Sequence, residues 1–520
     1  MLENYLNNRF LTLYLIPFII GSLSVLTFEP FNLTILNFLI FPLFFYLLVY
    51  VNKKSKAVYR KKPHKINLFI YGLAFGFGFY LSGISWITNS LTFDENFRVL
   101  IPFALILIPL FLSLFIGFTT LLVGSYLKLN FPSLLVFSAS LAFSDYLRAY
   151  IFSGFPWNLW AYSLVSFNEI LQTVNKIGLF SFNLFVITIF TLPIIIFFEI
   201  GKIKKLFSIF LTISFLLGVY IYGDYVNNKN NKILKDDIEK KYFKVISPNF
   251  DLEYNLNSRE IEERFMKLIR FSDPEPKKKT VFIWPEGVFS GYSYNELLMF
   301  KELISKNFSN NHNIIFGTNI LEPTTGNFYN SMIIINNNFD IIQRYNKRKL
   351  VPFGEFLPFQ HLLKKFGLKK ITEGHGSYQR GQENNNIIID KLNSLPLICY
   401  EIIFPDLIKK SNVNTNLIIN ISEDGWFGKS IGPDQHFAKS IFRAIENNTF
   451  LIRSANQGVS AIIDNKGNII KRLNRNEAGN IEFDVPLVKS NKLKNDLIFF
   501  ILLITYLLIF LIYRNQNAKK

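Results

Sequence analysis

Long apolar segments dominate the first half of the chain and recur once near its end. Eight can be delimited: Leu11 to Phe28, Phe31 to Val51, Ile66 to about Asn89, Val99 to Leu127, Phe131 to about Phe143, Ile177 to Phe198, Leu206 to Tyr222, and Leu497 to Tyr513. About 20 apolar residues cross the hydrocarbon core of a membrane as a helix. The pattern therefore predicts a polytopic α-helical membrane protein with eight spans, although the fifth is short and must include polar residues to cross.

The charges between these segments alternate in sign. The loops after the second, fourth and sixth segments are basic, most strongly at residues 52–65, whereas the intervening loops carry Glu29, Asp94 and Glu95. By the positive-inside rule the basic loops are cytoplasmic. Both termini are then expected inside, and the region from about 223 to 492 outside, the cytoplasm. The basic run 52–65 has a second interpretation, as a surface for anionic lipid headgroups.

The region from about 240 to 485 follows another pattern. Helical periodicity marks Ser258 to Ile269 and His436 to Glu446. Short apolar runs bounded by turn residues predict strands: Tyr242 to Ile246, Thr280 to Trp284, Asn313 to Asn319, Tyr329 to Asn336, Ile341 to Tyr345, Leu395 to Cys399, Leu417 to Ile421, Phe450 to Ser454 and Val459 to Asp464. Such alternation predicts one α/β domain with a central sheet. The expected organisation is a membrane domain at 1–225, an α/β domain at 235–487 and a final span at 494–514.

Composition narrows the class of protein. The chain has 520 residues, of which 50% are hydrophobic and 17% aromatic, with a net charge of +18. That is too apolar for an ordinary soluble enzyme, and the basic charge is better explained by membrane topology than by nucleic acid. The single cysteine excludes an intrachain disulfide. The five histidines lack metal-ligand spacing and no glycine-rich phosphate loop is present, so no metal or cofactor is expected.

A polar segment interrupts the apolar half of the chain. Asp145 and Arg148 end the fifth apolar segment, and the aromatic stretch 152–163 (FSGFPWNLWAYS) follows. Charges at membrane depth are costly and usually face a cavity or each other. Two interpretations stay open: an anchoring loop held by one ion pair, or a wall of a lipid-accessible cavity.

Three strand ends in the α/β domain carry reactive groups. Glu286 follows one strand in FIWPEG, Lys347 follows another in RYNKRKLVPFGEFLP, which also supplies Glu355, and Cys399 ends a third in LPLICYEIIFP. A carboxylate accepts a thiol proton, and an ammonium lowers the thiol pKa and stabilises an oxyanion. Glu355 is expected to hold the lysine or to act as a second acid–base group. Taken singly, each residue is more often structural, and Cys399 alone reads equally well as a buried, inert side chain.

The order of these motifs resembles the nitrilase superfamily, whose fold is a four-layer α-β-β-α sandwich. With the eight predicted spans, the whole chain resembles the apolipoprotein N-acyltransferase family of bacteria. Further matching segments are FSGFPW (152–157), ISEDGWFGKSIGPDQHF (421–437) and LIRSANQGVSAIID (451–464). Two departures are ISPNF after the first strand, where the family more often has glutamine, and Glu423, where asparagine is common.

This resemblance implies a specific reaction. The family transfers a fatty acyl chain from a phospholipid, with phosphatidylethanolamine the expected donor, to the α-amino group of a diacylglyceryl-modified N-terminal cysteine on an apolipoprotein. It implies that Cys399 is the nucleophile, Glu286 the general base and Lys347 the oxyanion stabiliser. It adds supporting roles for Glu355, Tyr400, Glu401 and Trp426. The expected course is a ping-pong reaction through a cysteine thioester, at the periplasmic side of the bacterial inner membrane.

Two other functions share part of the pattern. A membrane-anchored amidase of the nitrilase type would use the same Glu-Lys-Cys set, but it needs one anchor rather than eight spans. A transporter with an outer binding domain would show charged or broken helices repeated in two halves, and the sequence has no such repeat.

Overall fold

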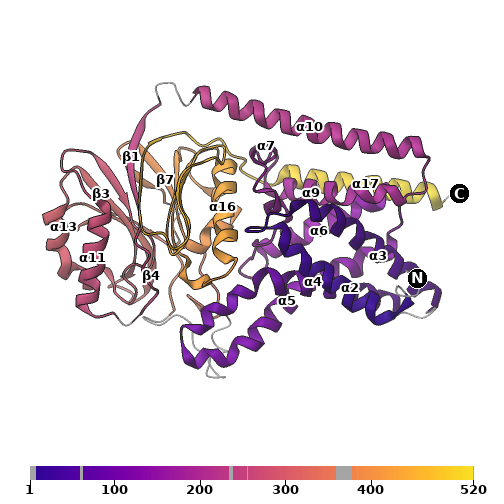
Figure 1. Ribbon diagram of the computed structural model, residues 1–520, viewed down its shortest axis with the longest axis horizontal. Helices are drawn as coiled ribbons and strands as arrows, with labels where there is room; N and C mark the ends of the chain where they lie inside the picture. The colour runs from indigo at the N-terminus through magenta and orange to yellow at the C-terminus, as the bar shows by residue number, and fades with distance from the viewer. Residues whose placement is uncertain are drawn as a thin grey trace. The chain divides into compact units, whose positions relative to one another are not determined.

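The computed structural model describes residues 7–58, 63–233, 238–254, 256–358, 377–382 and 385–518 (Figure 1). The chain divides into two compact units. One unit comprises Met1–Val226 with Asn495–Lys520, and the other comprises Asn227–Lys494.

The described residues of the first unit form helices joined by turns and loops, with no strand among them. Its α-helices are α2 (Ile16–Leu23), α3 (Asn37–Val58), α4 (Pro63–Ile84), α5 (Ile101–Val123), α6 (Phe131–Tyr150), α7 (Asn168–Leu171), α8 (Val174–Ile177), α9 (Leu179–Thr191) and α17 (Leu497–Ala518). A further helix, α10 (Lys202–Ile233), begins in this unit and ends beyond its boundary at Val226. Short π or 3₁₀ segments extend or link them: η1 (Leu11–Leu15), η2 (Ser24–Thr27), η3 (Thr34–Leu36), η4 (Ser85–Thr92), η5 (Glu95–Leu100), η6 (Gly124–Tyr126), η7 (Trp160–Leu164) and η8 (Leu192–Phe197).

Several of these helices are long and apolar enough to cross a membrane. Within the described residues six stretches meet this standard: Thr34–Lys56, His64–Thr92, Glu95–Tyr126, Leu179–Phe197, Lys202–Asn230 and Leu497–Gln516. Leu11–Thr27 is apolar but shorter. The segment predicted to begin at Phe131 forms the helix α6, and it carries Asp145 and Arg148 in its last turns. The unit thus has the character of a membrane protein, and the count of eight spans stays a prediction.

The second unit contains two six-stranded sheets rather than the single central sheet expected from the pattern alone. The first has the order β12-β1-β2-β3-β4-β5 and the second the order β11-β10-β9-β8-β7-β6. Their strands are β1 (Lys240–Ser247), β2 (Thr280–Ile283), β3 (His312–Leu321), β4 (Phe328–Ile335), β5 (Ile341–Asn346), β6 (Ile387–Ile389), β7 (Leu392–Ile398), β8 (Leu417–Glu423), β9 (Phe450–Asn456), β10 (Ser460–Ile463), β11 (Ile469–Leu473) and β12 (Gly479–Pro486).

Helices cover the outer faces of both sheets (Figure 1). They are α11 (Ser258–Ser272), α12 (Tyr294–Leu297), α13 (Lys301–Asn307), α15 (Pro405–Lys410) and α16 (Gly432–Asn447). One apolar core joins the inner faces of the two sheets, through residues such as Val245, Ile283, Ile419 and Ile452. Another packs the first sheet against its helices, where Phe265 of α11 stacks on Phe289 at a ring distance of 4.2 Å. The layers form the α-β-β-α sandwich expected from the resemblance.

The two sheets repeat one topology. Each has three parallel strands, β1-β2-β3 or β7-β8-β9, followed by two antiparallel strands and flanked by one more on the other side. Because two antiparallel steps separate β3 from β5, β5 points the same way as β2. The strand ends that precede Glu286 and Lys347 therefore lie at the same edge of the first sheet.

Candidate active site

Each of the three principal candidates follows the end of a strand. Glu286 comes three residues after β2, Lys347 directly follows β5, and Cys399 directly follows β7 as the first residue of the 3₁₀ segment η11 (Cys399–Ile403). Glu286 and Lys347 therefore come from the first sheet and Cys399 from the second. The predicted position of Cys399 at a strand exit is confirmed.

A buried charge cluster gathers at the first sheet. The Lys347 ammonium lies 2.8 Å from Glu355 Oε1 and 3.5 Å from Glu286 Oε1. Asn330 of β4 bridges the two carboxylates, since its Nδ2 donates to Glu355 Oε1 at 2.7 Å and to Glu286 Oε1 at 2.8 Å. The Lys347 side chain is only 2% exposed. A buried ammonium needs such paired and hydrogen-bonded partners, because its desolvation is costly.

Main-chain donors fix the two carboxylates. The Val351 N–H donates to Glu355 Oε2 at 2.8 Å, and the Glu423 N–H donates to Glu286 Oε2 at 3.2 Å. Gly287 has φ +77°, and a Cβ there would come within 2.7 Å of Glu423 Oε2. Glycine adopts this left-handed backbone without the steric cost of a side chain. Glu423, one of the two departures from the family pattern, therefore lies beside the candidate base.

The backbone of Cys399 has φ +45°, which is unusual for a non-glycine residue. The thiol is buried in the core between the two sheets. Burial raises the pKa of the Cys399 thiol, the charge of Glu286 raises this pKa further, and Lys347 acts in the opposite direction without outweighing them. The sequence argument expected the lysine to lower the thiol pKa. Lys347 exerts that effect, but burial reverses the net direction, so the Cys399 side chain at rest is a neutral thiol.

Lys347 itself stays charged. Burial by itself lowers the pKa of its ammonium, but Glu286 and Glu355 outweigh burial and hold the Lys347 pKa well above its ordinary value. The site at rest thus contains a fixed positive charge beside a neutral thiol, which is the arrangement required to stabilise a developing oxyanion.

Glu401 anchors the turn that carries Cys399. Its carboxylate accepts from the main-chain N–H groups of Arg348 at 2.8 Å, Lys349 at 3.1 Å and Ile398 at 2.9 Å. It also accepts from the Tyr345 hydroxyl at 2.9 Å. Glu401 therefore ties the end of β7 to the segment that follows β5, and so ties the turn of the nucleophile to that of the lysine.

The remaining two predicted residues lie in different surroundings. The Tyr400 ring packs edge-on against Phe404 at 5.0 Å. Burial raises the pKa of the Tyr400 hydroxyl while the charge of Lys347 opposes this, which puts Tyr400 within electrostatic reach of the cluster. Trp426 is half-buried and its ring lies 5.8 Å from that of Tyr254. This aromatic contact involves none of the three principal candidates.

Sequence reasoning missed several polar residues around the site. Asn330 and Arg453 lie within the largely apolar strands β4 and β9, a placement that could have marked them as polar residues with a role. His436 is one of the five histidines without metal-ligand spacing, yet its ring is fully buried and its Nε2 lies 3.2 Å from the main-chain oxygen of Cys399. No group of three or more His, Cys, Asp or Glu among the described residues is arranged to hold a metal ion.

The polar segment of the first unit forms a closed structural cluster. Asp145 Oδ1 lies 2.8 Å from Arg148 Nη2, and Asn183 Nδ2 donates to Asp145 Oδ2 at 2.9 Å. Arg148 also donates to the main-chain oxygen of Phe155. The ion pair orients Arg148 at the end of α6, and the hydrogen bond from Arg148 to Phe155 holds the loop that follows, in agreement with the anchoring interpretation.

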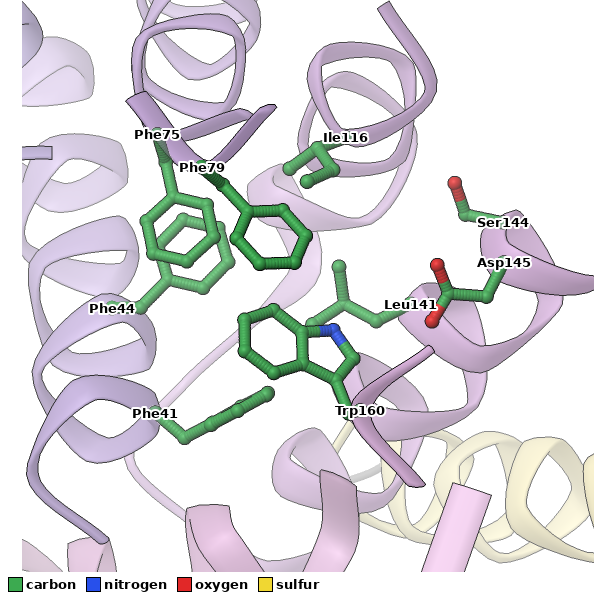
Figure 2. Close-up of a pocket in the computed structure, with 9 residues that line it drawn as sticks. All are labelled: Phe41, Phe44, Phe75, Phe79, Ile116, Leu141, Ser144, Asp145 and Trp160. Carbon is green, nitrogen blue, oxygen red and sulfur yellow. The ribbon is translucent and has the colours of Figure 1, made fainter. Parts of the chain in front are cut away.

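A small aromatic cavity adjoins this cluster (Figure 2). It is lined by side chains from four helices and one 3₁₀ segment: Phe41, Phe44, Phe75, Phe79, Ile116, Leu141, Ser144, Asp145 and Trp160. Its volume is about 10 Å³, the lower limit for one water molecule. An acyl chain does not fit there, so this cavity does not supply the lipid-accessible space of the other interpretation.

Comparison with known proteins identifies two family regions. The Carbon-nitrogen hydrolase family matches residues 257–495, and the Apolipoprotein N-acyltransferase N-terminal domain matches residues 20–192. Among solved structures, Saccharomyces cerevisiae Nit3, a member of branch 10 of the nitrilase superfamily, is similar with a TM-score of 0.36 and 17% identity, covering 48% of this chain and 90% of that chain.

Curated relatives match along nearly the whole length. The apolipoprotein N-acyltransferase of Rickettsia typhi is 33% identical over 519 residues, covering 95% of this chain and 98% of the relative. That of Bradyrhizobium diazoefficiens is 30% identical over 485 residues, covering 90% and 88%. That of Rhodopseudomonas palustris is 29% identical over 491 residues, covering 91% and 89%. With this similarity across both units, the chain belongs to the apolipoprotein N-acyltransferase family.

Proposed function

We propose that this enzyme moves a fatty acyl chain from a membrane phospholipid onto Cys399 as a thioester, and then onto the α-amino group of the N-terminal diacylglyceryl-cysteine of apolipoproteins. The proposal rests on one observation in a chain of this family: the charges of Glu286 and Lys347 in the Glu286–Lys347–Glu355 cluster act on the thiol of Cys399. Glu286 and Lys347 both act on the pKa of the thiol, as a base and an electrostatic stabiliser must.

In the first half-reaction Glu286 takes the Cys399 proton while the sulfur attacks the ester carbonyl. Lys347, held by Glu355, stabilises the oxyanion. The tetrahedral intermediate collapses, the bond to the glycerol oxygen breaks, and Glu286 returns its proton to that oxygen. The products are the thioester and a lysophospholipid. Because the thiol is neutral at rest, proton removal and attack are coupled, and the sulfur is not left as a free anion between turnovers.

In the second half-reaction the neutral amine of the acceptor attacks the thioester. Glu286 accepts a proton from the amine and delivers it to the departing sulfur, which restores the thiol. The amide product leaves with the acyl chain. Glu401 keeps the nucleophile turn against the lysine segment, and Tyr400 and Trp426 are assigned supporting roles at the rim. Exclusion of water must keep hydrolysis slower than aminolysis.

The proposal includes a topology. It comprises eight spans, a membrane domain at 1–225, a periplasmic catalytic domain at 235–487 and a last span at 494–514, in a bacterial inner membrane with both termini cytoplasmic. The basic loops of the sequence support this orientation. A reporter fused after residue 230 is expected to lie outside the cytoplasm, and a cytoplasmic signal there would overturn the orientation.

Mass spectrometry of Cys399 after incubation with defined phospholipids tests the chemistry. Phosphatidylethanolamine alone should add one acyl mass to the peptide containing Cys399 and release lysophospholipid. When a diacylglyceryl lipopeptide is then added, the Cys399 peptide should lose the acyl mass and the lipopeptide should gain it. Cys399→Ala should do neither. If Cys399→Ala still acylates the lipopeptide, the mechanism is wrong. Release of free fatty acid in place of lipopeptide acylation would identify an amidase-like hydrolase instead.

A further inference from the structure

A second buried polar network lies behind the nucleophile and takes no part in the proton transfers described above. It consists of Ser422 of β8, Asp424 of the 3₁₀ segment η12 (Asp424–Phe427), His436 of α16 and Arg453 of β9. Their side chains are all nearly or completely buried. Burying charged side chains costs desolvation free energy, so the presence of this network requires an explanation.

Arg453 organises the network. Its Nη2 donates to Asp424 Oδ2 at 2.7 Å and lies 3.1 Å from His436 Nδ1. Its Nε donates to the main-chain oxygen of Val459 at 3.2 Å, and its Nη1 donates to the side chain of Asn420. An arginine Nη atom carries two hydrogens, so Nη2 has one for Asp424 and one for His436.

These contacts fix the hydrogen of the His436 ring. Burial and the charge of Arg453 lower the His436 pKa to about 4, although Asp424 opposes them, so the ring is neutral near pH 7. His436 Nδ1 lies 3.1 Å from Arg453 Nη2, a pure donor, and also 3.0 Å from Asp424 Oδ1, a pure acceptor, so the surroundings of Nδ1 allow either tautomer. Nε2 lies 3.2 Å from the main-chain oxygen of Cys399, a pure acceptor, and this contact assigns the hydrogen of the neutral ring to Nε2, which leaves Nδ1 to accept from Arg453. Asp424 Oδ1 accepts from the Ser422 hydroxyl at 2.7 Å and from Arg453 Nη2 at 2.9 Å.

We propose that His436 is a positioning residue for the nucleophile, whose Nε2–H holds the carbonyl of Cys399 and with it the left-handed turn that aims the thiol at Glu286 and Lys347. Arg453 and Asp424 hold the ring, and Ser422 donates to Asp424 and so holds that carboxylate in place. The inference rests on the proposed function, because the value of an aimed thiol lies in thioester formation.

Substitutions at one position separate this role from simple packing. In His436→Gln the side-chain amide nitrogen reaches the place of Nε2 and can donate to Cys399, whereas in His436→Asn it reaches only the place of Nδ1. His436→Leu fills the space without a donor. Both polar variants keep hydrogen-bonding capacity in the core, so the pair is matched apart from reach.

The first readout is the single-turnover rate constant for acylation of Cys399 by phosphatidylethanolamine, which does not depend on the fraction of folded enzyme. His436→Gln should stay within about 3-fold of wild type. His436→Asn and His436→Leu should fall by about 10- to 100-fold, with an unchanged phospholipid KM, because a misplaced nucleophile lowers the rate of the chemical step. Equal rates for Gln and Asn, or an effect confined to KM, would overturn the positioning role.

The second readout is the alkylation of Cys399 by iodoacetamide, which needs no acyl transfer and reports on this residue alone because the chain has one cysteine. Releasing the carbonyl should expose the buried thiol, so His436→Asn and His436→Leu should alkylate at least about 5-fold faster, and His436→Gln should not. If the variants differ in alkylation as described but wild type forms no thioester, the proposed function is refuted and the positioning role is retained. Wild type that forms the thioester, with identical alkylation in all variants, would refute the positioning role alone.

Discussion

Lys347 lies 2.8 Å from Glu355 and 3.5 Å from Glu286. The lysine is therefore paired more closely with Glu355 than with Glu286, the carboxylate proposed as the base. Because Lys347 stays paired with Glu355, Glu286 can accept a proton without leaving the buried ammonium of Lys347 unpaired. Two glutamates of the same charge thus acquire different tasks from their contacts.

Replacement of the base should separate chemistry from binding. Glu286→Gln keeps the shape and can still accept from Asn330, but it cannot take the thiol proton. We expect the rate of thioester formation to fall by about 10²- to 10⁴-fold, the range typical for loss of a general base. Single-turnover release of lysophospholipid measures it. The exposed Glu263 of α11 is the matched control, and Glu263→Gln should leave the rate unchanged.

The side-chain amide of Asn330 bridges two carboxylates and should therefore affect the acylation rate although it is uncharged. Asn330→Ala removes a donor shared by two buried carboxylates, and hydrogen bonds to charged groups contribute about 1.5–3 kcal/mol each. The acylation rate should fall by about 10- to 100-fold in the same assay. Asn338→Ala, at an exposed turn, serves as the control. An Asn330→Ala enzyme with wild-type rate would show that Lys347 alone holds the pair.

The electrostatics of Cys399 predict opposite effects on two reactions. Since Glu286 raises the thiol pKa, Glu286→Gln should lower it and shift the pH profile of iodoacetamide alkylation to lower pH, while thioester formation slows. Since Lys347 lowers the pKa, Lys347→Gln should shift the profile to higher pH. Wild-type alkylation should still be rising above pH 9. A wild-type plateau near neutral pH would instead indicate a resting thiolate.

Two glycines provide a matched test of the contact between Gly287 and Glu423. Both Gly287, with φ +77°, and Gly326, with φ +66°, have left-handed backbones. A Cβ added at Gly287 would lie 2.7 Å from Glu423 Oε2, whereas a Cβ added at Gly326 would have no atom within 4 Å. Each alanine variant should lose about 1–2 kcal/mol of stability from backbone strain. Only Gly287→Ala should also slow acylation, as thermal unfolding and single-turnover rates will show.

The buried ion pair Asp145–Arg148 of the first unit should contribute to stability and should have no catalytic effect of its own. Arg148→Met leaves Asp145 buried without its cation, a loss that typically costs about 3–5 kcal/mol. Asp145→Asn combined with Arg148→Met should recover part of this stability. Thermal aggregation in detergent measures both. The exposed pair Arg98–Glu95 gives the control, since Arg98→Met should change little.

Much of the catalytic unit could be read from the chain because its central strands are continuous apolar runs. The runs at Thr280, Leu395 and Leu417 all form strands, and Cys399 follows one of them directly. The strands β6, β11 and β12, all at sheet edges, were missed. In β11 and β12 charged residues interrupt the apolar pattern, and β6 has only three residues. The pattern also did not distinguish one sheet from two, because strand order depends on contacts distant in sequence.

The site residues divide in the same manner. Glu286, Lys347 and Cys399 stand at strand ends with recognisable neighbours, and their placement could be predicted. Asn330 and His436 acquire their partners only when β4 lies beside β5 and α16 packs against η11, so no local pattern shows those partners. The net direction of the Cys399 pKa likewise depends on burial, which the sequence does not show.

The origin of the catalytic groups from separate sheets has a consequence for biosynthesis. A chain emerging from the ribosome presents Glu286 and Lys347 long before Cys399, and the first sheet stays incomplete until β12, close to the end of the domain, pairs with β1. A chain still in synthesis therefore either lacks Cys399 or carries it in a domain whose first sheet has not yet received β12. On the proposed mechanism, Cys399 and its two partners reach their final geometry only after the last strand of the domain has been made.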